Sequence, residues 1–392
     1  MLSRLANRTS DIAPFFVMEL LGRAKQLEMQ GRDIIHMEIG EPDFATPQIV
    51  VDAGIRRLQT GDIKYTPAAG LPELRQKIAD YYQTRYAVTV DKGRIFVTPG
   101  ASGAFLLALA ASVNPGDEIV MADPCYPCNS NFIKLFEGKA ITLPVDATTN
   151  YQLTAELIKR QWTPSTKGVL IASPSNPTGT LIEPDEFKQC IELVNECGGC
   201  FYSDEIYHGL VYGKHAPTAL EYSDNAFVIN SFSKYFGMTG WRIGWLIVPY
   251  DFVEAAEKLA QNIFIATPTL SQYAALAAFD EQNLEELESR RAEFAVRRDF
   301  LYNALLQLGF EIPAKPDGAF YIYANCAKFT KDSYEFALEF LEAEGVAITP
   351  GIDFGSFKAN EHLRFAYTTS IGRIAEAMQR LEQFINKNKN KG

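Results

Sequence analysis

Hydrophobic and polar positions along this chain follow two periods that take turns. From about residue 46 onward, short apolar runs of strand length alternate with longer segments in which apolar residues recur at helical spacing. Parallel strands need such long connections, because the chain must return to the starting end of the sheet before each new strand. The pattern therefore predicts an α/β fold with a mostly parallel sheet covered by helices on both faces. The predicted strands are 94–98, 118–121, 139–143, 168–172, 200–203, 226–229 and 245–248, and the clearest helices are 101–111 and 184–197.

The two ends of the chain have a different pattern. Near the start, apolar residues at helical spacing before Gly31 and an alternating segment after it predict a helix and a strand. Near the other end, a long charged amphipathic stretch lies between Asn283, a candidate N-cap, and Gly309, a candidate stop. These segments predict a smaller α+β domain made from both ends of the chain. Its predicted helices are 17–30, 283–308 and 333–344, and its predicted strands include 34–39 and 318–324.

Size and composition fit a two-domain organisation. The chain has 392 residues, 47% of them hydrophobic, which is enough for a separate core in each of two domains. We predict a large domain at residues 44–282 and a small domain at residues 1–43 and 283–392, with 283–308 as the helix that links them.

The charge balance and the apolar runs narrow the class of protein. A net charge of −11 argues against a nucleic-acid surface, because phosphate backbones are bound by clustered lysine and arginine. The longest apolar run, residues 104–113, is too short to cross a bilayer, and charges at Arg4, Arg8 and Asp11 interrupt any secretory signal. We therefore predict a cytoplasmic protein with no membrane or nucleic-acid partner.

Six cysteines and four histidines are the candidate soft metal ligands. Two Cys-x-x-Cys pairs, Cys125/Cys128 and Cys197/Cys200, have the spacing of half a zinc site or of a redox disulfide. The pairs lie far apart, however, and neither belongs to a thioredoxin-like unit, while the histidines show no metal-ligand spacing. We predict reduced, structural thiols and no metal site, and a redox role of the pairs stays open.

The richest chemistry lies at residues 231–245, Ser-Phe-Ser-Lys-Tyr-Phe-Gly-Met-Thr-Gly-Trp-Arg-Ile-Gly-Trp, directly after an apolar strand. This segment places Lys234 among aromatic residues, hydroxyls, glycines and Arg242. Apolar surroundings and a nearby cation lower the pKa of a lysine amine, so that its neutral form can condense with an aldehyde. Lys234 is therefore the candidate covalent residue. A surface lysine in a glycine-containing loop is the competing interpretation.

Three further polar segments follow predicted strands, at the edge of the sheet where α/β folds bind ligands. Residues 99–103, Pro-Gly-Ala-Ser-Gly, open a helix and can direct backbone N–H groups at an anion. Residues 173–179, Ser-Pro-Ser-Asn-Pro-Thr-Gly, and 203–207, Ser-Asp-Glu-Ile-Tyr, add an amide and a carboxylate. Each segment alone could be a turn or a helix cap. The first one lacks the dinucleotide-binding Gly-x-Gly-x-x-Gly spacing, and the chain has no P-loop motif, so nucleotide binding loses support.

Together these motifs resemble those of the class I and II aminotransferases, pyridoxal-phosphate enzymes of fold type I that include aspartate aminotransferase. The resemblance covers nearly the whole chain. It implies that Lys234 forms the Schiff base with pyridoxal 5'-phosphate. Hydroxyls and an arginine fork suit a phosphate dianion, which needs several directed hydrogen bonds. The implied phosphate ligands are Ser231, Ser233 and Arg242, with Ala101 and Ser102 at the helix start.

The same resemblance assigns the remaining site residues. Asp204 pairs with the pyridine nitrogen of the cofactor and keeps it protonated, which makes the ring an electron sink. Arg364, in His-Leu-Arg-Phe-Ala-Tyr, clamps the substrate α-carboxylate with its planar fork. Tyr65 reaches the phosphate in the neighbouring subunit, which implies a homodimer with shared sites. The other implied contacts are Asn176 and Tyr207 at the phenolic oxygen, Tyr126 on the ring face, and Gly40 and Asn176 beside the substrate.

The predicted function is transfer of an amino group from an L-amino acid to a 2-oxo acid. Lys234 would serve first as the covalent tether and then as the group that moves the α proton. A β-eliminating C–S lyase on the same fold is the alternative, because the pocket directs what the cofactor makes possible. A regulator with this fold would need a DNA-binding module, for which we expect no room, and an inactive scaffold would not need the full set of site residues.

The substrate is the least specified part of the prediction. The aromatic residues Phe15, Phe16, Tyr126 and Tyr367 suggest an apolar side-chain pocket. No arginine or lysine is assigned to a side-chain carboxylate. We therefore expect a neutral amino donor, with 2-oxoglutarate or pyruvate as the acceptor.

Overall fold

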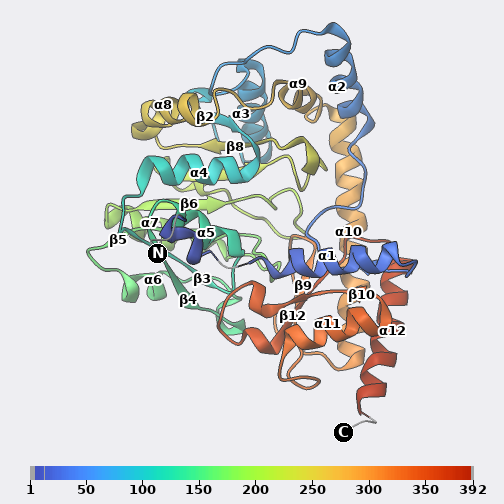
Figure 1. Ribbon diagram of the computed structural model, residues 1–392. Coiled ribbons are helices and arrows are strands. Elements are labelled where there is room, and N and C mark those ends of the chain that lie inside the picture. Colours follow the sequence, from blue (N-terminus) through green and yellow to red (C-terminus); the bar gives the residue numbers. More distant parts are fainter. Residues whose placement is uncertain (1–4, 13, 390–392) are drawn as a thin grey trace.

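The computed structural model describes residues 5–12 and 14–389, and a seven-stranded sheet lies at its centre (Figure 1). β8 runs antiparallel to both of its neighbours, and the remaining pairs are parallel. All seven strands predicted for this sheet are present, so the mostly parallel sheet is confirmed. The strand order is β2 (Ile95–Thr98), β8 (Gly244–Ile247), β7 (Ala226–Ser231), β6 (Cys200–Asp204), β5 (Thr166–Ala172), β3 (Glu118–Asp123) and β4 (Lys139–Pro144).

Helices cover both faces of this sheet. In β7, Phe227 points to the face covered by α4 (Gly100–Ser112) and α8 (Val253–Ile263), whereas Val228 points to the face covered by α7 (Pro184–Glu196). Because helices shield both faces from water, the central strands are largely buried, which explains the apolar runs in the sequence, whereas the edge strand β4 alternates between exposed and partly buried residues. The other helices of this region are α2 (Gln48–Thr60), α3 (Pro72–Tyr86), α5 (Pro127–Leu135), α6 (Ala155–Gln161) and α9 (Thr269–Ala277).

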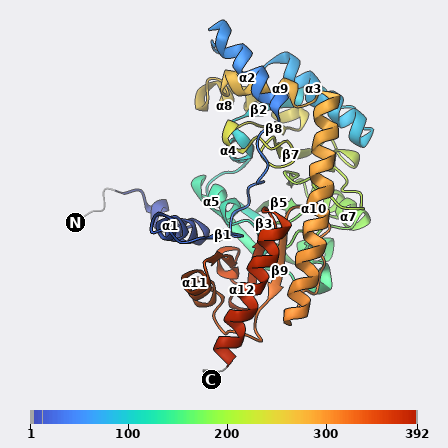
Figure 2. The same ribbon diagram turned by 90° about the vertical axis from the view of Figure 1, so that its right-hand side faces the viewer.

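The two ends of the chain meet in a second, smaller unit, drawn in blue and red in Figures 1 and 2. A strand from the start of the chain, β1 (Ile35–His36), pairs in parallel with β10 (Val346–Ala347). Beside this pair lies an antiparallel sheet whose order is β11, β12, β9. Its elements, with the helices of this unit, are β11 (Thr349–Pro350), β12 (His362–Ala366), β9 (Tyr321–Asn325), α1 (Phe16–Met29), α11 (Ser333–Glu344) and α12 (Ile371–Lys389).

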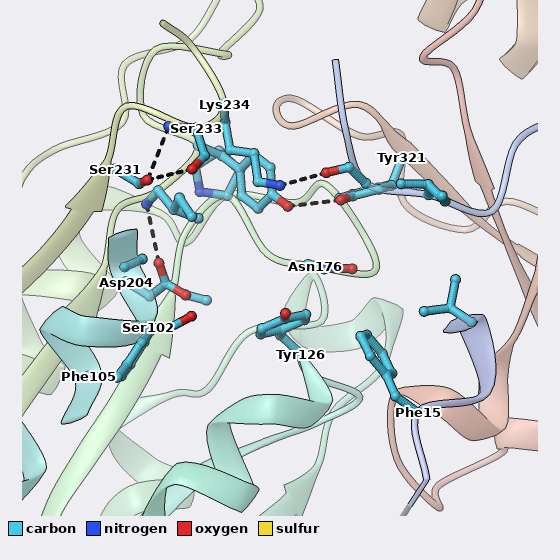
Figure 3. A pocket seen from close by; sticks show the side chains of 18 of the residues that line it. Phe15, Ser102, Phe105, Tyr126, Asn176, Asp204, Ser231, Ser233, Lys234 and Tyr321 are labelled. Atoms are coloured by element: carbon cyan, nitrogen blue, oxygen red, sulfur yellow. Dashed lines mark hydrogen bonds between the residues drawn. The ribbon is translucent and has the colours of Figure 1, made fainter. Parts of the chain in front are cut away.

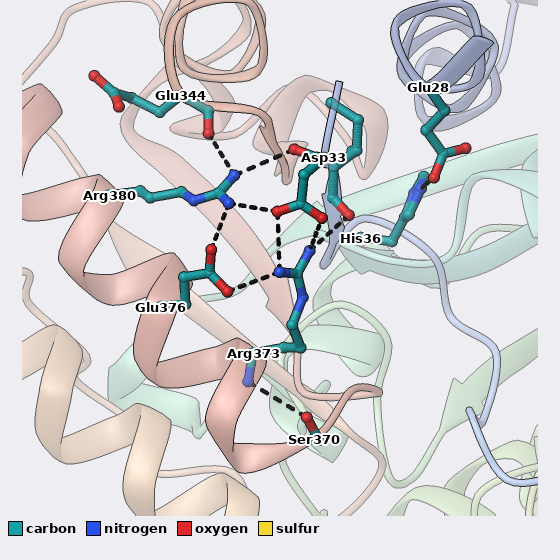
Figure 4. Close-up of polar contacts among 9 residues, drawn as sticks. Glu28, Asp33, His36, Glu344, Ser370, Arg373, Glu376 and Arg380 are labelled. Carbon is teal, nitrogen blue, oxygen red and sulfur yellow. Dashed lines mark hydrogen bonds and ion pairs between the residues drawn. The ribbon is translucent and has the colours of Figure 1, made fainter. Parts of the chain in front are cut away.

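A charged cluster fastens the first strand of the chain to its last helix (Figure 4). Asp33, just before β1, accepts hydrogen bonds from Arg373 at 2.7 Å and from Arg380 at 2.5 Å, both on α12. These two arginines lower the pKa of Asp33. Glu376 lies between them on the same helix and accepts a further bond from Arg373 at 2.7 Å. Segments 340 residues apart in sequence are joined in this way.

The long helix α10 (Glu281–Leu308) begins earlier than predicted. Its N-cap residue is Asp280, and Asn283 lies inside the first turn, where its side chain donates to the Ala278 carbonyl at 2.8 Å. The prediction of Asn283 as the N-cap was therefore wrong, whereas the predicted stop is confirmed by Gly309, which has a left-handed φ of +95°. Although α10 is long, no helix in the described part of the chain is apolar and long enough to cross a membrane.

The strand predicted at residues 34–39 is shorter than expected, since regular strand structure is confined to β1 and backbone hydrogen bonds to neighbouring strands continue only to Met37. Beyond it, the backbone carbonyl of Glu38 accepts hydrogen bonds from side chains rather than from a neighbouring strand. Its donors are the hydroxyl of Thr349, at 2.9 Å, and the guanidinium of Arg364. The chain leaves the strand at this point because it contributes to a polar site.

Candidate active site

A cavity of about 230 Å³ opens at the carboxyl ends of β5, β6 and β7 (Figure 3). Ala172, Asp204 and Ser231, the last residues of these three strands, line it. The smaller unit closes the opposite side through Tyr321 of β9 and Arg364 of β12. The cavity therefore lies at the edge of the sheet where α/β folds bind ligands.

Most residues singled out in the sequence meet in this cavity. Among the residues assigned to the cofactor or the substrate, Tyr65 is the exception, because it lies between α2 and α3, is 82% exposed and does not line the cavity. Its contact with a neighbouring subunit stays a prediction. The predicted residues that do line the cavity are Gly40, Ala101, Ser102, Tyr126, Asn176, Asp204, Tyr207, Ser231, Ser233, Lys234, Arg242 and Arg364.

Lys234 lies in the turn after β7, and its Nζ donates to the carbonyl of Gly40 at 2.5 Å (Figure 3). Burial lowers the pKa of Lys234 to about 8. Glu41 opposes this shift, and the cations of Arg364 and Arg242 add to it. An amine with such a pKa has a sizeable neutral fraction near neutral pH, so it can attack a carbonyl carbon and exchange protons.

Asp204 is a buried carboxylate at the end of β6. Burial raises its pKa to about 6, while the backbone N–H of Ile206 and the charge of Lys234 act in the opposite direction. That N–H donates to Oδ1 of Asp204 at 3.2 Å. A buried carboxylate with so little neutralisation favours a cationic or N–H partner in the cavity.

Backbone and hydroxyl donors converge beside Lys234 in an arrangement that suits an anion. The helix α4 begins at Gly100, and the preceding residue supplies no side-chain cap for its free N–H groups. A Cβ atom at Gly100 would lie 2.7 Å from the guanidinium of Arg242, so the glycine lets this arginine approach the helix start. The hydroxyls of Ser231 and Ser233 lie 2.9 Å apart in the same corner. A phosphate dianion matches this set of donors.

Arg364 is held in place by acceptors on its two terminal nitrogens. One donates to Oδ1 of Asn176 at 2.9 Å and the other to the Glu38 carbonyl, while the guanidinium lies 4.3 Å from the ring centre of Tyr321. The Nε atom is buried and has no hydrogen-bond partner. An arginine fixed in this way presents its planar guanidinium to the cavity in one orientation, which suits a carboxylate partner.

Tyr321 is a site residue that sequence reasoning missed. Its hydroxyl lies 2.9 Å from the hydroxyl of Tyr207, and a Cβ atom at Gly40 would lie only 1.9 Å from it. The close approach explains why glycine is needed at position 40. The segment around Tyr321 was predicted only as a strand. The chain has 18 tyrosines, and nothing in the sequence around Tyr321 distinguishes it from the others.

The apolar wall of the cavity was predicted only in part. Phe15 and Tyr126 line the cavity, as expected. The expectation was wrong for Phe16, whose ring packs against Tyr334, and for Tyr367, which is buried elsewhere and donates to the Ala319 carbonyl. The wall includes residues that were not predicted, namely Val17, Met18, Ile39, Phe105, Phe132 and Ile206.

The six cysteines are free thiols in the structure. Burial raises the pKa of Cys125 and of Cys326 to about 12, which keeps these thiols protonated. Within the described residues, no group of three or more His, Cys, Asp or Glu side chains is placed to hold a metal ion.

Comparison with known proteins agrees with this geometry. The family model described as aminotransferase class I and II matches residues 32–381. The chain is 39% identical to a (5-formylfuran-3-yl)methyl phosphate transaminase of Methanocaldococcus jannaschii, over 98% of this chain and 100% of that protein. It is 38% identical to a valine–pyruvate aminotransferase of Mycobacterium tuberculosis, over 98% of this chain and 99% of that protein.

Solved structures give the same result for the fold. An aminotransferase from Mycobacterium tuberculosis superposes with a TM-score of 0.95 at 37% identity, covering 98% of this chain and 100% of that one. Aspartate aminotransferase from Thermus thermophilus with maleate superposes with a TM-score of 0.92 at 30% identity, covering 97% of this chain and 100% of that one.

The cofactor of this family fits the residues present. Arg242, two hydroxyls and the start of α4 match its phosphate, buried Asp204 matches a protonated ring nitrogen, and the amine of Lys234 matches its aldehyde. The fold, the cavity and the relatives lead to one conclusion: the chain belongs to the class I and II aminotransferases, and it is a pyridoxal-phosphate-dependent enzyme of fold type I that moves an amino group from an amino acid to a 2-oxo acid.

Proposed function

We propose that this aminotransferase takes amino donors with neutral, apolar side chains and uses pyruvate in preference to 2-oxoglutarate as the acceptor. One observation carries the proposal: the cations that line the cavity of the described chain are Lys234, Arg242 and Arg364. Each has another role in the proposed reaction, so the lining of this chain supplies no cation for a second substrate carboxylate. A desolvated carboxylate without a cation is costly, which disfavours aspartate, glutamate and 2-oxoglutarate.

The wall that would enclose the side chain supports the same choice. Its residues come from the start of α1, from α4 and from α5, and they are aliphatic or aromatic. Apolar side chains gain about 25 cal/mol for each Å² that they bury against such a wall. A small acceptor such as pyruvate has a single carboxylate, so it needs only Arg364 as its cationic partner. The residues of this wall are Phe15, Val17, Met18, Phe105 and Phe132.

We assign the steps of the reaction to the residues as follows. Bound pyridoxal phosphate supplies a ring that stabilises the charge left when the substrate α-carbon loses its proton. Lys234 would hold the cofactor covalently through its amine and, as a free amine, would carry the α proton. Asp204 holds the ring nitrogen in its protonated state. Arg364 binds the substrate α-carboxylate, together with Gly40 and Asn176.

The remaining assignments concern how the cofactor is held. Hydroxyls, backbone N–H groups and a guanidinium offer the phosphate enough donors to offset its loss of water. An aromatic ring on the cofactor face and donors at its phenolic oxygen fix its tilt. We assign the phosphate to Ala101, Ser102, Ser231, Ser233 and Arg242, the ring face to Tyr126, and the phenolic oxygen to Asn176 and Tyr207.

A panel of amino acids, each tested for the half-reaction by the absorbance of the bound cofactor, checks the proposed donors. We expect leucine and valine to react with a kcat/KM at least about tenfold above that of aspartate, which corresponds to the loss of one ion pair. A faster reaction with aspartate or glutamate would refute the proposal. Release of ammonia without consumption of an oxo acid would instead identify the C–S lyase.

We further propose a homodimer with shared sites, in which Tyr65 of one copy contacts the phosphate bound by the other. Its 82% exposure in the single chain leaves its hydroxyl available for this contact. Sedimentation should give twice the chain mass, and Tyr65→Phe should weaken cofactor retention. A monomer at working concentration that is fully active would contradict the proposal.

Two further proposals concern the domain division of the chain and its location in the cell. We propose that residues 44–282 form the cofactor-binding domain and that 1–43 and 283–392, linked by 283–308, form the smaller one. Limited proteolysis with cleavage near 283 would support this division, and cleavage within the seven-stranded sheet would argue against it. We also propose a cytoplasmic location, which cell fractionation would test directly.

A further inference from the structure

The start of α1 forms part of the cavity wall without a local cap. Phe15, Val17 and Met18 line the cavity, and the helix begins at Phe16. Phe15, the N-cap residue, makes no side-chain hydrogen bond to the first turn. The free N–H groups of that turn therefore need an acceptor from elsewhere in the fold.

Asp353 supplies that acceptor from the other end of the chain. Its Oδ1 accepts the N–H of Phe16 at 2.9 Å, across 337 residues of sequence. The residue ends the short turn Gly351–Asp353 that follows β11, and it is only 5% exposed. Its other oxygen, Oδ2, is buried without a hydrogen-bond partner, so the carboxyl group is oriented by the helix start.

The remainder of α1 is attached independently of Asp353. The guanidinium of Arg23 donates two hydrogen bonds to the carboxylate of Glu342 on α11, one of them 3.0 Å long. Leu20, Ala24 and Leu27 are buried against the strands and helix of the smaller unit. Asp353 is therefore a polar attachment at the cavity end of the helix, where Phe15 also packs against Tyr126 and Phe16 against Tyr334.

The same short segment also contacts the residue proposed to bind the substrate carboxylate. Thr349, four positions before Asp353, accepts from Arg364 at 3.2 Å. One stretch of backbone thus places both the arginine and the start of α1. Movement at Asp353 would change the distance between the carboxylate clamp and the apolar wall.

We propose that Asp353 is a positioning residue that fixes the first turn of α1 against the cavity and thereby sets the preference for apolar donor side chains. The selectivity part of this inference rests on the proposed function, whereas the attachment of α1 does not. Asp353 does not itself line the cavity, and it acts through Phe15, Val17 and Met18, which do.

The groups around Asp353 determine how selectivity for apolar donors should change with pH. Burial raises its pKa to about 6; Arg364 of β12 and the N–H groups of Phe16 and Val17 oppose the shift, and Glu19 of α1 adds to it. Cys128 of α5 also faces the group. Because the N–H groups of Phe16 and Val17 lower the pKa of Asp353, they bind its carboxylate more tightly than its protonated form, and deprotonation favours the docked position of α1. Selectivity for apolar donors should therefore fall as pH falls through about 6.

Three variants of the holoenzyme test the inference with leucine and alanine as donors. Asp353→Ala should raise the KM for leucine about tenfold, the equivalent of one lost hydrogen bond, and leave the KM for alanine within about twofold. Asp353→Asn keeps an acceptor and should behave like the wild type, without its fall in selectivity between pH 8 and 5.5. Thr154→Ala removes the side-chain cap of α6, away from the cavity, and should change neither KM.

Hydrogen exchange gives a second readout that does not depend on the donor. Amides 16–18 should exchange faster in Asp353→Ala than in Asp353→Asn or Thr154→Ala. Equal changes in KM for leucine and alanine, or unchanged exchange at these amides, would overturn the positioning role. A wild type that prefers aspartate to leucine would overturn the proposed donor class instead, and the exchange result would still decide the role of Asp353.

Discussion

The two sides of the cavity are held by the fold in different ways. One side carries Lys234, Asp204 and Arg242 at the carboxyl ends of buried strands and in the turn that follows. The other side carries Phe15 and Met18 at the start of α1. The strands are fixed by helices on both faces, whereas α1 depends on polar contacts that reach 337 and 319 residues along the sequence.

This difference separates the chemistry of the enzyme from its selectivity. Proton transfer needs groups at fixed distances, and a buried sheet provides that rigidity. Recognition of a side chain needs only a wall of suitable shape, which a helix on the outside of the fold can provide. We therefore expect changes on the strand side to affect every donor and changes on the α1 side to affect discrimination among donors.

The largest effect is expected on the strand side, from Lys234→Ala. Turnover should fall by at least about 10⁴-fold with every donor, because the variant loses both the covalent tether and the proton carrier. Cofactor should stay bound, since the phosphate ligands are untouched. Steady-state rates and the cofactor content of the purified variant measure the two effects. Lys258→Ala, at an exposed position on α8, is the control, and turnover by Lys234→Ala near that of the control would refute the assignment.

The next effect concerns the carboxylate clamp between the two sides. Arg364→Lys should raise the KM for amino donors about 10- to 100-fold and change kcat much less, because lysine keeps the charge but cannot bond Asn176 and the Glu38 carbonyl together. The increase should be equal for leucine and alanine, since both present the same carboxylate. An unchanged KM would refute the role of Arg364 as the carboxylate clamp. An increase confined to leucine would show that Arg364 contacts the donor side chain instead.

A smaller effect is expected from Tyr321→Phe. The change removes the 2.9 Å hydrogen bond to Tyr207, and kcat/KM should fall about five- to tenfold for all donors. Tyr323→Phe is a matched control on the same strand, because the hydroxyl of Tyr323 is buried without a partner and its loss should be neutral or stabilising. Equal losses in the two variants would mean that Tyr321 only fills space.

The strand side of the cavity could be predicted from the sequence because its signals are local. Each strand is a short apolar run, and the polar residue that follows it must lie at the edge of the sheet. Lys234 was found in this way, whereas Asp204 and Asn176, which also lie at strand ends, received their roles from the resemblance to the family. The aromatic Tyr126 was located by its resemblance to the family motif, and the structure places it in the same cavity.

The α1 side could be predicted only at Phe15, because its neighbours are distant in sequence. The helix itself was expected, but which residues face the cavity depends on Asp353 and on the pairing of β1 with β10. Tyr321 was missed for the same reason, since its partner Tyr207 is 114 residues away. The prediction of where α10 starts was wrong for a different reason. Asp280 and Asn283 are both residue types that cap helices well, and the local sequence does not choose between them.

The smallest effect tests the far end of the same helix. Nδ1 of His36 lies 2.7 Å from a carboxylate oxygen of Glu38, and Nε2 lies 3.2 Å from one of Glu28 on α1. The hydrogen bond to Glu38 raises the pKa of His36 to about 9, although partial burial acts against this shift. Because the folded pKa exceeds the ordinary value of 6.5, the stabilisation is complete below pH 6.5 and is lost as pH rises through 9.

Between pH 6.5 and 9.5, the unfolding free energy of the wild type should therefore fall by about 1 kcal/mol more than that of His36→Gln. The difference is this small because solvent screens the partly exposed imidazole. Urea denaturation of both proteins at both pH values measures this difference, and groups that titrate in both cancel. A difference that does not change with pH would mean that the His36 charge does not hold α1. Loss of stability with unchanged kcat for alanine would place the effect on the α1 side, because the strand ends that carry the chemistry are held independently of this helix.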